Sequence, residues 1–103
     1  MAQSPRNFFT TVETRLGNDG LSSNSLSQDI QNLIRNNQVT RTQVDYIQRK
    51  LDLAQNTWRN AFNSISNYSD PGFEKSATLD LINGKIGNLN TVQRSLNSLR
   101  GPV

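Results

Sequence analysis

The sequence predicts an all-α protein in which two long helices form an antiparallel hairpin with coiled-coil-like packing, preceded by two short helices. Apolar residues in the middle of the chain repeat at alternating steps of three and four, which keeps one narrow stripe facing a partner helix. This stripe, the seam, consists of Val44, Ile47, Leu51, Ala54, Trp58, Ala61, Ile65 and Tyr68. A second apolar stripe follows a short group of turn residues, as expected for two antiparallel neighbours. The length favours a single helical domain over 1–103.

The first short helix is expected at about 5–16. Ser4 is its N-cap, and Pro5 fits the first helical position, where a missing N–H costs nothing. Gly17 is the expected C-terminal stop. The apolar face of this helix comprises Phe8, Phe9, Val12 and Leu16.

The second short helix is expected at about 25–36 and begins at a capping box formed by Ser25 and Gln28. Its buried face comprises Leu26, Ile30, Leu33 and Ile34. Some of these residues share the heptad phase of the seam, so one continuous helix over 25–68 is the alternative. We favour two helices because cap signals interrupt the pattern between them.

The first long helix is expected at about 40–67. Thr40 and Gln43 form a capping box, while Val39 and Val44 occupy the two positions of a hydrophobic staple. These paired signals mark the clearest boundary in the chain.

The second long helix is expected at about 73–99, with Asp70 or Ser76 as its N-cap. Its apolar stripe comprises Leu79, Ile82, Ile86, Leu89, Val92, Leu96 and Leu99. Asn83 and Gly84 also form a signal for a two-residue β-hairpin turn. In that register most cross-strand pairs would combine an apolar with a polar residue, whereas a helix gathers the whole stripe on one face, so we favour the helix.

The missing residue types exclude most enzymatic chemistry. The chain has no His and no Cys, which removes the usual general base, the thiol nucleophile and nearly every zinc site. No pair of carboxylates is placed for acid and base roles, and no glycine-rich phosphate loop is present. We therefore expect a protein that is not an enzyme and that uses no cofactor, metal or small-molecule ligand.

Membrane insertion and signal-directed export are also not expected. The sequence contains no uninterrupted apolar run of about 18 residues, so no membrane span is predicted. The first residues lack the apolar core of a signal peptide. We expect synthesis in the cytoplasm, with packaging into a virion or export by a signal-less route left open.

The composition favours a structural or assembly protein that self-associates or docks through helix packing, such as a component of a phage particle or a secretion apparatus. Only 33% of the residues are hydrophobic and 18% are charged, which implies a thin core and a weakly charged surface. A small inhibitor or adaptor protein is an alternative.

The candidate protein-contact residues are Tyr46, Leu53, Trp58 and Phe62. Tyr46 and Leu53 lie one heptad apart on the back of the first long helix. We expect a short helix to pack on them, and contact with a partner protein is the alternative. Trp58 lies in the seam between Ala54 and Ala61, whose small side chains leave room for the indole, so we expect it to be buried.

A nucleic-acid-binding regulator is the second alternative, because the net charge is +3. Its candidate contacts are Arg41, Arg49 and Arg59. Residues 51–59 resemble the turn and recognition helix of repressor-type helix-turn-helix proteins, although Asp52 stands where those proteins carry a glycine. Asp45 is expected to pair with Arg49. We expect only weak, non-specific DNA binding, because carboxylates share the face that carries the arginines.

Overall fold

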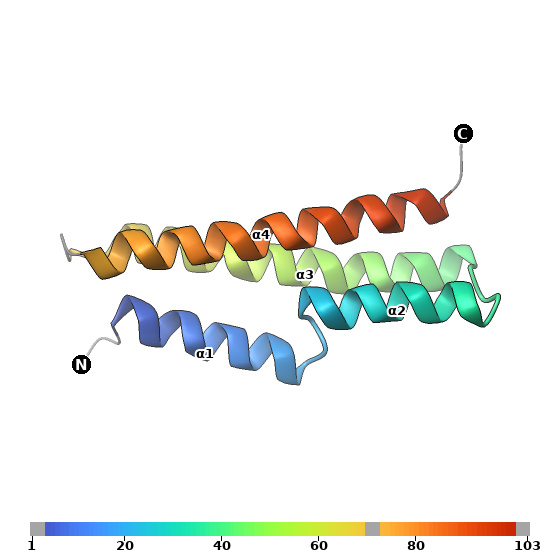
Figure 1. Ribbon diagram of the computed structural model, residues 1–103, viewed down its shortest axis with the longest axis horizontal. Coiled ribbons are helices and arrows are strands. Elements are labelled where there is room, and N and C mark those ends of the chain that lie inside the picture. The colour runs from blue at the N-terminus through green and yellow to red at the C-terminus, as the bar shows by residue number, and fades with distance from the viewer. Residues whose placement is uncertain (1–3, 70–72, 101–103) are drawn as a thin grey trace.

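The computed structural model describes residues 4–69 and 73–100. Within these ranges the chain forms four helices and no strand, as the sequence predicts. The helices are α1 (Pro5–Asn18), α2 (Ser23–Arg35), α3 (Arg41–Ser66) and α4 (Phe73–Leu99). The long helices α3 and α4 pack against each other as the expected antiparallel hairpin (Figure 1).

The two short helices together act as one interrupted third helix. α1 and α2 run in the same direction, one after the other, along the α3–α4 hairpin (Figure 1). Each of them contacts both α3 and α4. The molecule is therefore an elongated three-helix bundle in cross-section, with extents of 50 × 27 × 16 Å.

The seam is buried within a single chain. Every seam residue of α3 from Val44 to Ile65 is at most 4% exposed, and Tyr68 is half-buried. The facing residues Ile82, Leu89, Val92 and Leu96 of α4 are buried as well. Because α1, α2 and α4 together cover this surface, no second chain is needed to bury it.

α1 ends later than expected from the sequence. The helix passes through Gly17 to Asn18, and the stop is a Schellman motif around Gly20, whose φ is 72°. The N–H of Leu21 donates to the carbonyl of Leu16 at 2.8 Å, and Gly20 N–H donates to Gly17 at 3.2 Å. Leu16 and Leu21 are both buried, so apolar packing selects Gly20 rather than Gly17 as the stop.

α2 begins earlier than expected. Its N-cap is Ser22, whose Oγ accepts from the backbone N–H of Ser25 at 3.1 Å, so the predicted cap at Ser25 is wrong. Ser22 is the first residue after the Schellman motif and has extended φ and ψ, the conformation that an N-cap requires.

A second Schellman motif separates α2 from α3, so the continuous helix over 25–68 is wrong. Asn37 adopts a φ of 54°, and the N–H of Gln38 donates to the carbonyl of Leu33 at 2.9 Å. Asparagine tolerates this left-handed conformation better than other non-glycine residues.

The start of α3 confirms one half of the predicted capping box. Thr40 Oγ1 accepts from Gln43 N–H at 3.2 Å, but the Thr40 N–H donates to the carbonyl of Gln38 instead of the Gln43 side chain. Of the expected staple pair, Val44 is buried and Val39 remains 41% exposed.

α4 is continuous through Asn83 and Gly84, so the helix prediction is confirmed and the β-hairpin is excluded. Ser76 lies inside the helix and is not its cap. The other predicted cap, Asp70, lies outside the described residues.

Candidate interaction surfaces

The most exposed large hydrophobic residues of the described chain are Tyr46 and Leu53, each 56% exposed. They lie one heptad apart on α3, which corresponds to about 10 Å along the helix axis. The expectation that a short helix buries them is wrong, because both side chains stay mostly exposed although α1 and α2 contact α3. Arg49, which is exposed, lies between them. We call Tyr46, Arg49 and Leu53 the α3 outer face.

Tyr46 also borders a groove of about 210 Å³ between α2 and α3. The groove has buried Leu33 and Ile47 in its lining. Lys50 Nζ lies 5.5 Å from the centre of the Tyr46 ring and pairs with Asp29 of α2 at 3.0 Å. These contacts hold the Lys50 side chain in place beside the aromatic ring.

Trp58 and Phe62, the other two candidate contact residues, belong to the packing of the bundle. Trp58 is 4% exposed, which confirms its expected burial, and its ring centre lies 5.2 Å from that of Phe9 in α1. Phe62 is half-buried against the core. In a single chain, only Tyr46 and Leu53 of the four present most of their side chains to solvent.

The candidate nucleic-acid contacts Arg41, Arg49 and Arg59 are exposed and form no ion pair within residues 4–69 and 73–100. Asp45 pairs at 3.7 Å with Arg100, the residue that follows α4, and not with Arg49 as expected. Residues 51–59 lie inside the uninterrupted α3, so the turn implied by the helix-turn-helix resemblance is absent.

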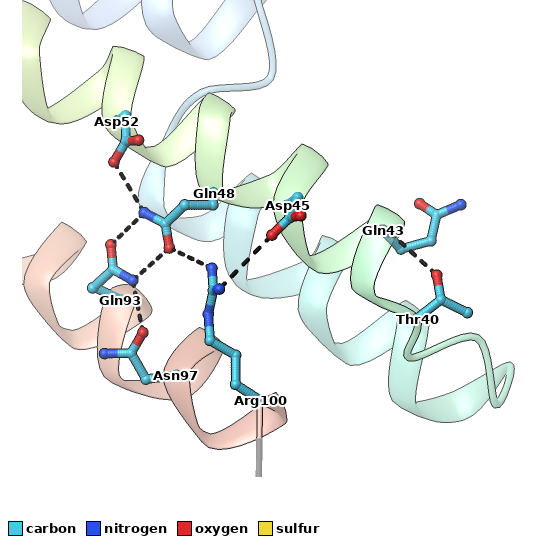
Figure 2. A network of polar contacts seen from close by, with 8 residues as sticks. All are labelled: Thr40, Gln43, Asp45, Gln48, Asp52, Gln93, Asn97 and Arg100. Atoms are coloured by element: carbon cyan, nitrogen blue, oxygen red, sulfur yellow. Dashed lines mark hydrogen bonds and ion pairs between the residues drawn. The ribbon is translucent and has the colours of Figure 1, made fainter. Parts of the chain in front are cut away.

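A polar network connects α3 to α4 (Figure 2). Gln48 Nε2 donates to Gln93 Oε1 and Gln93 Nε2 donates to Gln48 Oε1, both at 2.8 Å. Gln48 also donates to Asp52 at 2.9 Å and accepts from Arg100 at 3.1 Å, while Gln93 donates to Asn97 at 3.0 Å. Both amide hydrogens and both acceptor positions of Gln48 are therefore in use.

Apolar periodicity does not predict this network. Its one sequence signal is that Gln48 and Gln55 each directly follow a seam residue and lie one heptad apart. Gln55 is only 9% exposed, and its Nε2 donates to Asn90 of α4 at 3.3 Å. Amides at this heptad position thus border the hydrophobic interface and join the two long helices.

A groove of about 370 Å³ lies between the turn that precedes α3, the start of α3 and the C-terminal end of α4. These segments lie at the right of Figure 1. We call this groove the end groove, and it is lined by Val39, Thr40, Arg41, Val44, Asp45, Leu99 and Arg100. It combines three aliphatic side chains with two cations and one carboxylate. The groove is not evident from the sequence, because its walls come from residues that are far apart in the chain.

The described part of the chain shows no group of three or more acidic, histidine or cysteine side chains that could hold a metal ion. None of its helices combines the length and the apolar character that crossing a bilayer requires. In the comparisons with known proteins, no family model, no curated protein and no solved structure matches this chain.

Proposed function

We propose that this protein is a non-enzymatic assembly protein that self-associates or docks onto a larger protein complex through helix packing, with the α3 outer face as the contact surface. The observation that carries the proposal is the exposure of Tyr46 and Leu53, each 56%, on a helix whose opposite side is fully packed. Two exposed apolar side chains one heptad apart match the spacing with which a partner helix presents its own apolar residues.

The remaining chemistry of the chain agrees with a binding role. The absence of His and Cys leaves few groups able to perform general acid-base or nucleophilic catalysis. Arg49 lies between the two apolar residues in the sequence of α3, is exposed and has no ion-pair partner in the described chain, so a carboxylate of the partner could pair with it. The low fraction of charged residues, 18%, limits repulsion between neighbouring subunits.

Sedimentation velocity at low and high protein concentration tests the self-association form. We expect a concentration-dependent oligomer that is lost when Tyr46→Ser and Leu53→Ser are combined. The matched control is Leu81→Ser, which removes an exposed leucine, 38% exposed, from α4. Loss of the oligomer in the control alone would move the contact surface to α4 and contradict the proposed surface.

A monomer at high concentration would leave docking onto a different protein as the function, and a cross-linking experiment tests that form. A photoreactive amino acid at position 49 should give a discrete cross-linked species in the source cells, and Leu53→Ser should abolish it. The same amino acid at position 81 should give none. A monomeric protein that forms no species dependent on Leu53 would refute the proposed function.

A further inference from the structure

We propose that the end groove is a second binding site, which holds a short peptide segment carrying aliphatic side chains next to carboxylates, contributed by a partner protein. This site is separate from the α3 outer face, so the inference goes beyond the proposed function. Its volume of about 370 Å³ lies within the range of pockets that hold ligands in proteins.

The apolar part of the groove selects the aliphatic part of the ligand. Val44 is 4% exposed, Leu99 is half-buried and Val39 is 41% exposed. Val39 belongs to the turn between α2 and α3, and much of its side chain is in contact with water. An aliphatic side chain bound between these three residues would remove their exposed surface from water.

The charged part of the groove selects an acidic ligand. Arg41 is exposed and forms no ion pair with the described residues. Arg100 donates to Gln48 at 3.1 Å and lies 3.7 Å from Asp45, a separation too long for a direct hydrogen bond. The groove therefore carries two guanidinium groups and one carboxylate, and a ligand carboxylate would balance the second cation.

A peptide fits this chemistry better than a nucleic acid does. A phosphate backbone would satisfy Arg41 and Arg100 but would leave the three aliphatic residues of the groove without a partner. The aliphatic and cationic groups line one groove, so a single short segment can contact both kinds of group at once.

The test uses a fluorescein-labelled short peptide in which two adjacent leucines lie between two glutamates, titrated into the full chain and followed by polarisation. We expect a dissociation constant on the order of 100 µM, as is usual for a short flexible ligand. Two control peptides carry glutamines in place of the glutamates or serines in place of the leucines, and each should bind about 3- to 10-fold more weakly.

Variants of the groove should change the affinity in opposite directions. Arg41→Gln and Val39→Ser should each weaken binding about 3- to 10-fold, whereas Asp45→Asn should strengthen it about 2- to 3-fold by releasing Arg100. Arg59→Gln is the matched control, because it removes the same charge from the same helix at a distance of about 27 Å from Arg41. The Leu53→Ser variant should bind the peptide with unchanged affinity, because Leu53 belongs to the α3 outer face and not to the end groove. A failure of this proposal is therefore distinguishable from a failure of the proposed function.

The location of binding is checked by the amide NMR spectrum. The proposal is supported if the peptide changes the amide chemical shifts only of residues 39–45 and 99–100, and if the variants change the affinity as stated above. The proposal is overturned by equal binding of all three peptides, by an effect of Arg59→Gln as large as that of Arg41→Gln, or by shifts elsewhere. Binding only after removal of residues 101–103 would assign the groove to the chain itself and would also overturn it.

Discussion

Gln48 of α3 and Gln93 of α4 donate a side-chain hydrogen bond to each other, both at 2.8 Å, although they are 45 residues apart in the chain. This reciprocal pair requires the two amides to lie directly opposite each other. A shift of one helix along the other would break both bonds and would also displace Arg100, which donates to Gln48 at 3.1 Å. The pair therefore sets the register of the long hairpin in addition to stabilising it.

We expect Gln93→Ala to lower the free energy of unfolding by about 1–2 kcal/mol, because Gln48 would keep an unpaired donor and acceptor in a half-buried site. Asn97→Ala is the control, since Asn97 is exposed and forms the end of the network, and its effect should stay below about 0.5 kcal/mol. Replacing both Gln48 and Gln93 by Leu should recover most of the loss. Urea unfolding measures all three, and equal effects of the two alanine variants would contradict the prediction.

Trp58→Ala should destabilise the protein by about 3–5 kcal/mol, because the indole is 4% exposed and packs on Phe9. Tyr46→Ala removes an aromatic residue from the same helix, but Tyr46 is 56% exposed, so the cost should stay below about 1 kcal/mol. Chemical denaturation compares the two variants. Iodide should quench the native fluorescence of Trp58 only weakly, and strong quenching would show that the indole is accessible.

Thr78→Val should raise the stability by about 1 kcal/mol. Thr78 is 1% exposed, and its Oγ1 is buried without a hydrogen-bond partner in the described chain, so the native hydroxyl is desolvated without compensation. The control is Thr57→Val, because Thr57 Oγ1 donates to the carbonyl of Leu53 at 2.8 Å, and that variant should not gain stability. Destabilisation by Thr78→Val in a thermal melt would show that the hydroxyl has a partner.

Substitution of glycines by alanine should change stability in opposite directions at two kinds of position. Gly84 and Gly87 lie inside α4, and a Cβ at either would meet no atom within 4 Å, so each alanine should stabilise by about 0.5–1 kcal/mol. Gly20 has similar open space but a φ of 72°, so Gly20→Ala should destabilise by about 1 kcal/mol. Thermal melts of the three variants test this, and a stabilising Gly20→Ala would contradict the Schellman motif at the end of α1.

Binding to DNA should be weak, independent of sequence and absent at physiological salt. The exposed arginines Arg41, Arg49 and Arg59 extend over about 27 Å of α3, and Asp52 is exposed on the same helix. With few phosphate contacts, the logarithm of affinity should fall with the logarithm of salt concentration with a slope near −0.9 for each contact. Fluorescence polarisation measures the slope. Sub-micromolar binding that is lost in Arg49→Ala would contradict this prediction and would favour a nucleic-acid-binding regulator.

The period of the apolar residues was enough to predict the long hairpin. The seam from Val44 to Ile65 is buried as expected, and α3 and α4 have bounds within one residue of 40–67 and 73–99. Helix period and burial are linked physically, because only residues at steps of three and four share one side of a helix. Thr40 as the cap of α3 was predicted for a similarly local reason, since a cap acts over three residues.

Where two nearby residues could each begin or end a helix, only the tertiary structure determines which of them does so. Ser22 and Ser25 are both good caps, and Gly17 and Gly20 are both good stops, with intrinsic differences of about 1 kcal/mol or less. Burial of Leu16 and Leu21 favours Gly20 over Gly17 as the stop for α1, and this position of the turn then places Ser22 at the start of α2. Local sequence preference alone is too weak to decide between such alternatives.

The candidate site shows the same division between local and long-range information. Heptad spacing placed Tyr46 and Leu53 together on the back of α3, but only the placement of α1 and α2 in the bundle left them exposed. Three features join residues that are far apart in the chain. They are the Gln48–Gln93 pair, the ion pair of Asp45 with Arg100 in place of the expected Arg49, and the end groove. Periodicity determines which side of a helix is apolar, whereas the partner of each polar side chain is decided by how the helices are placed against one another.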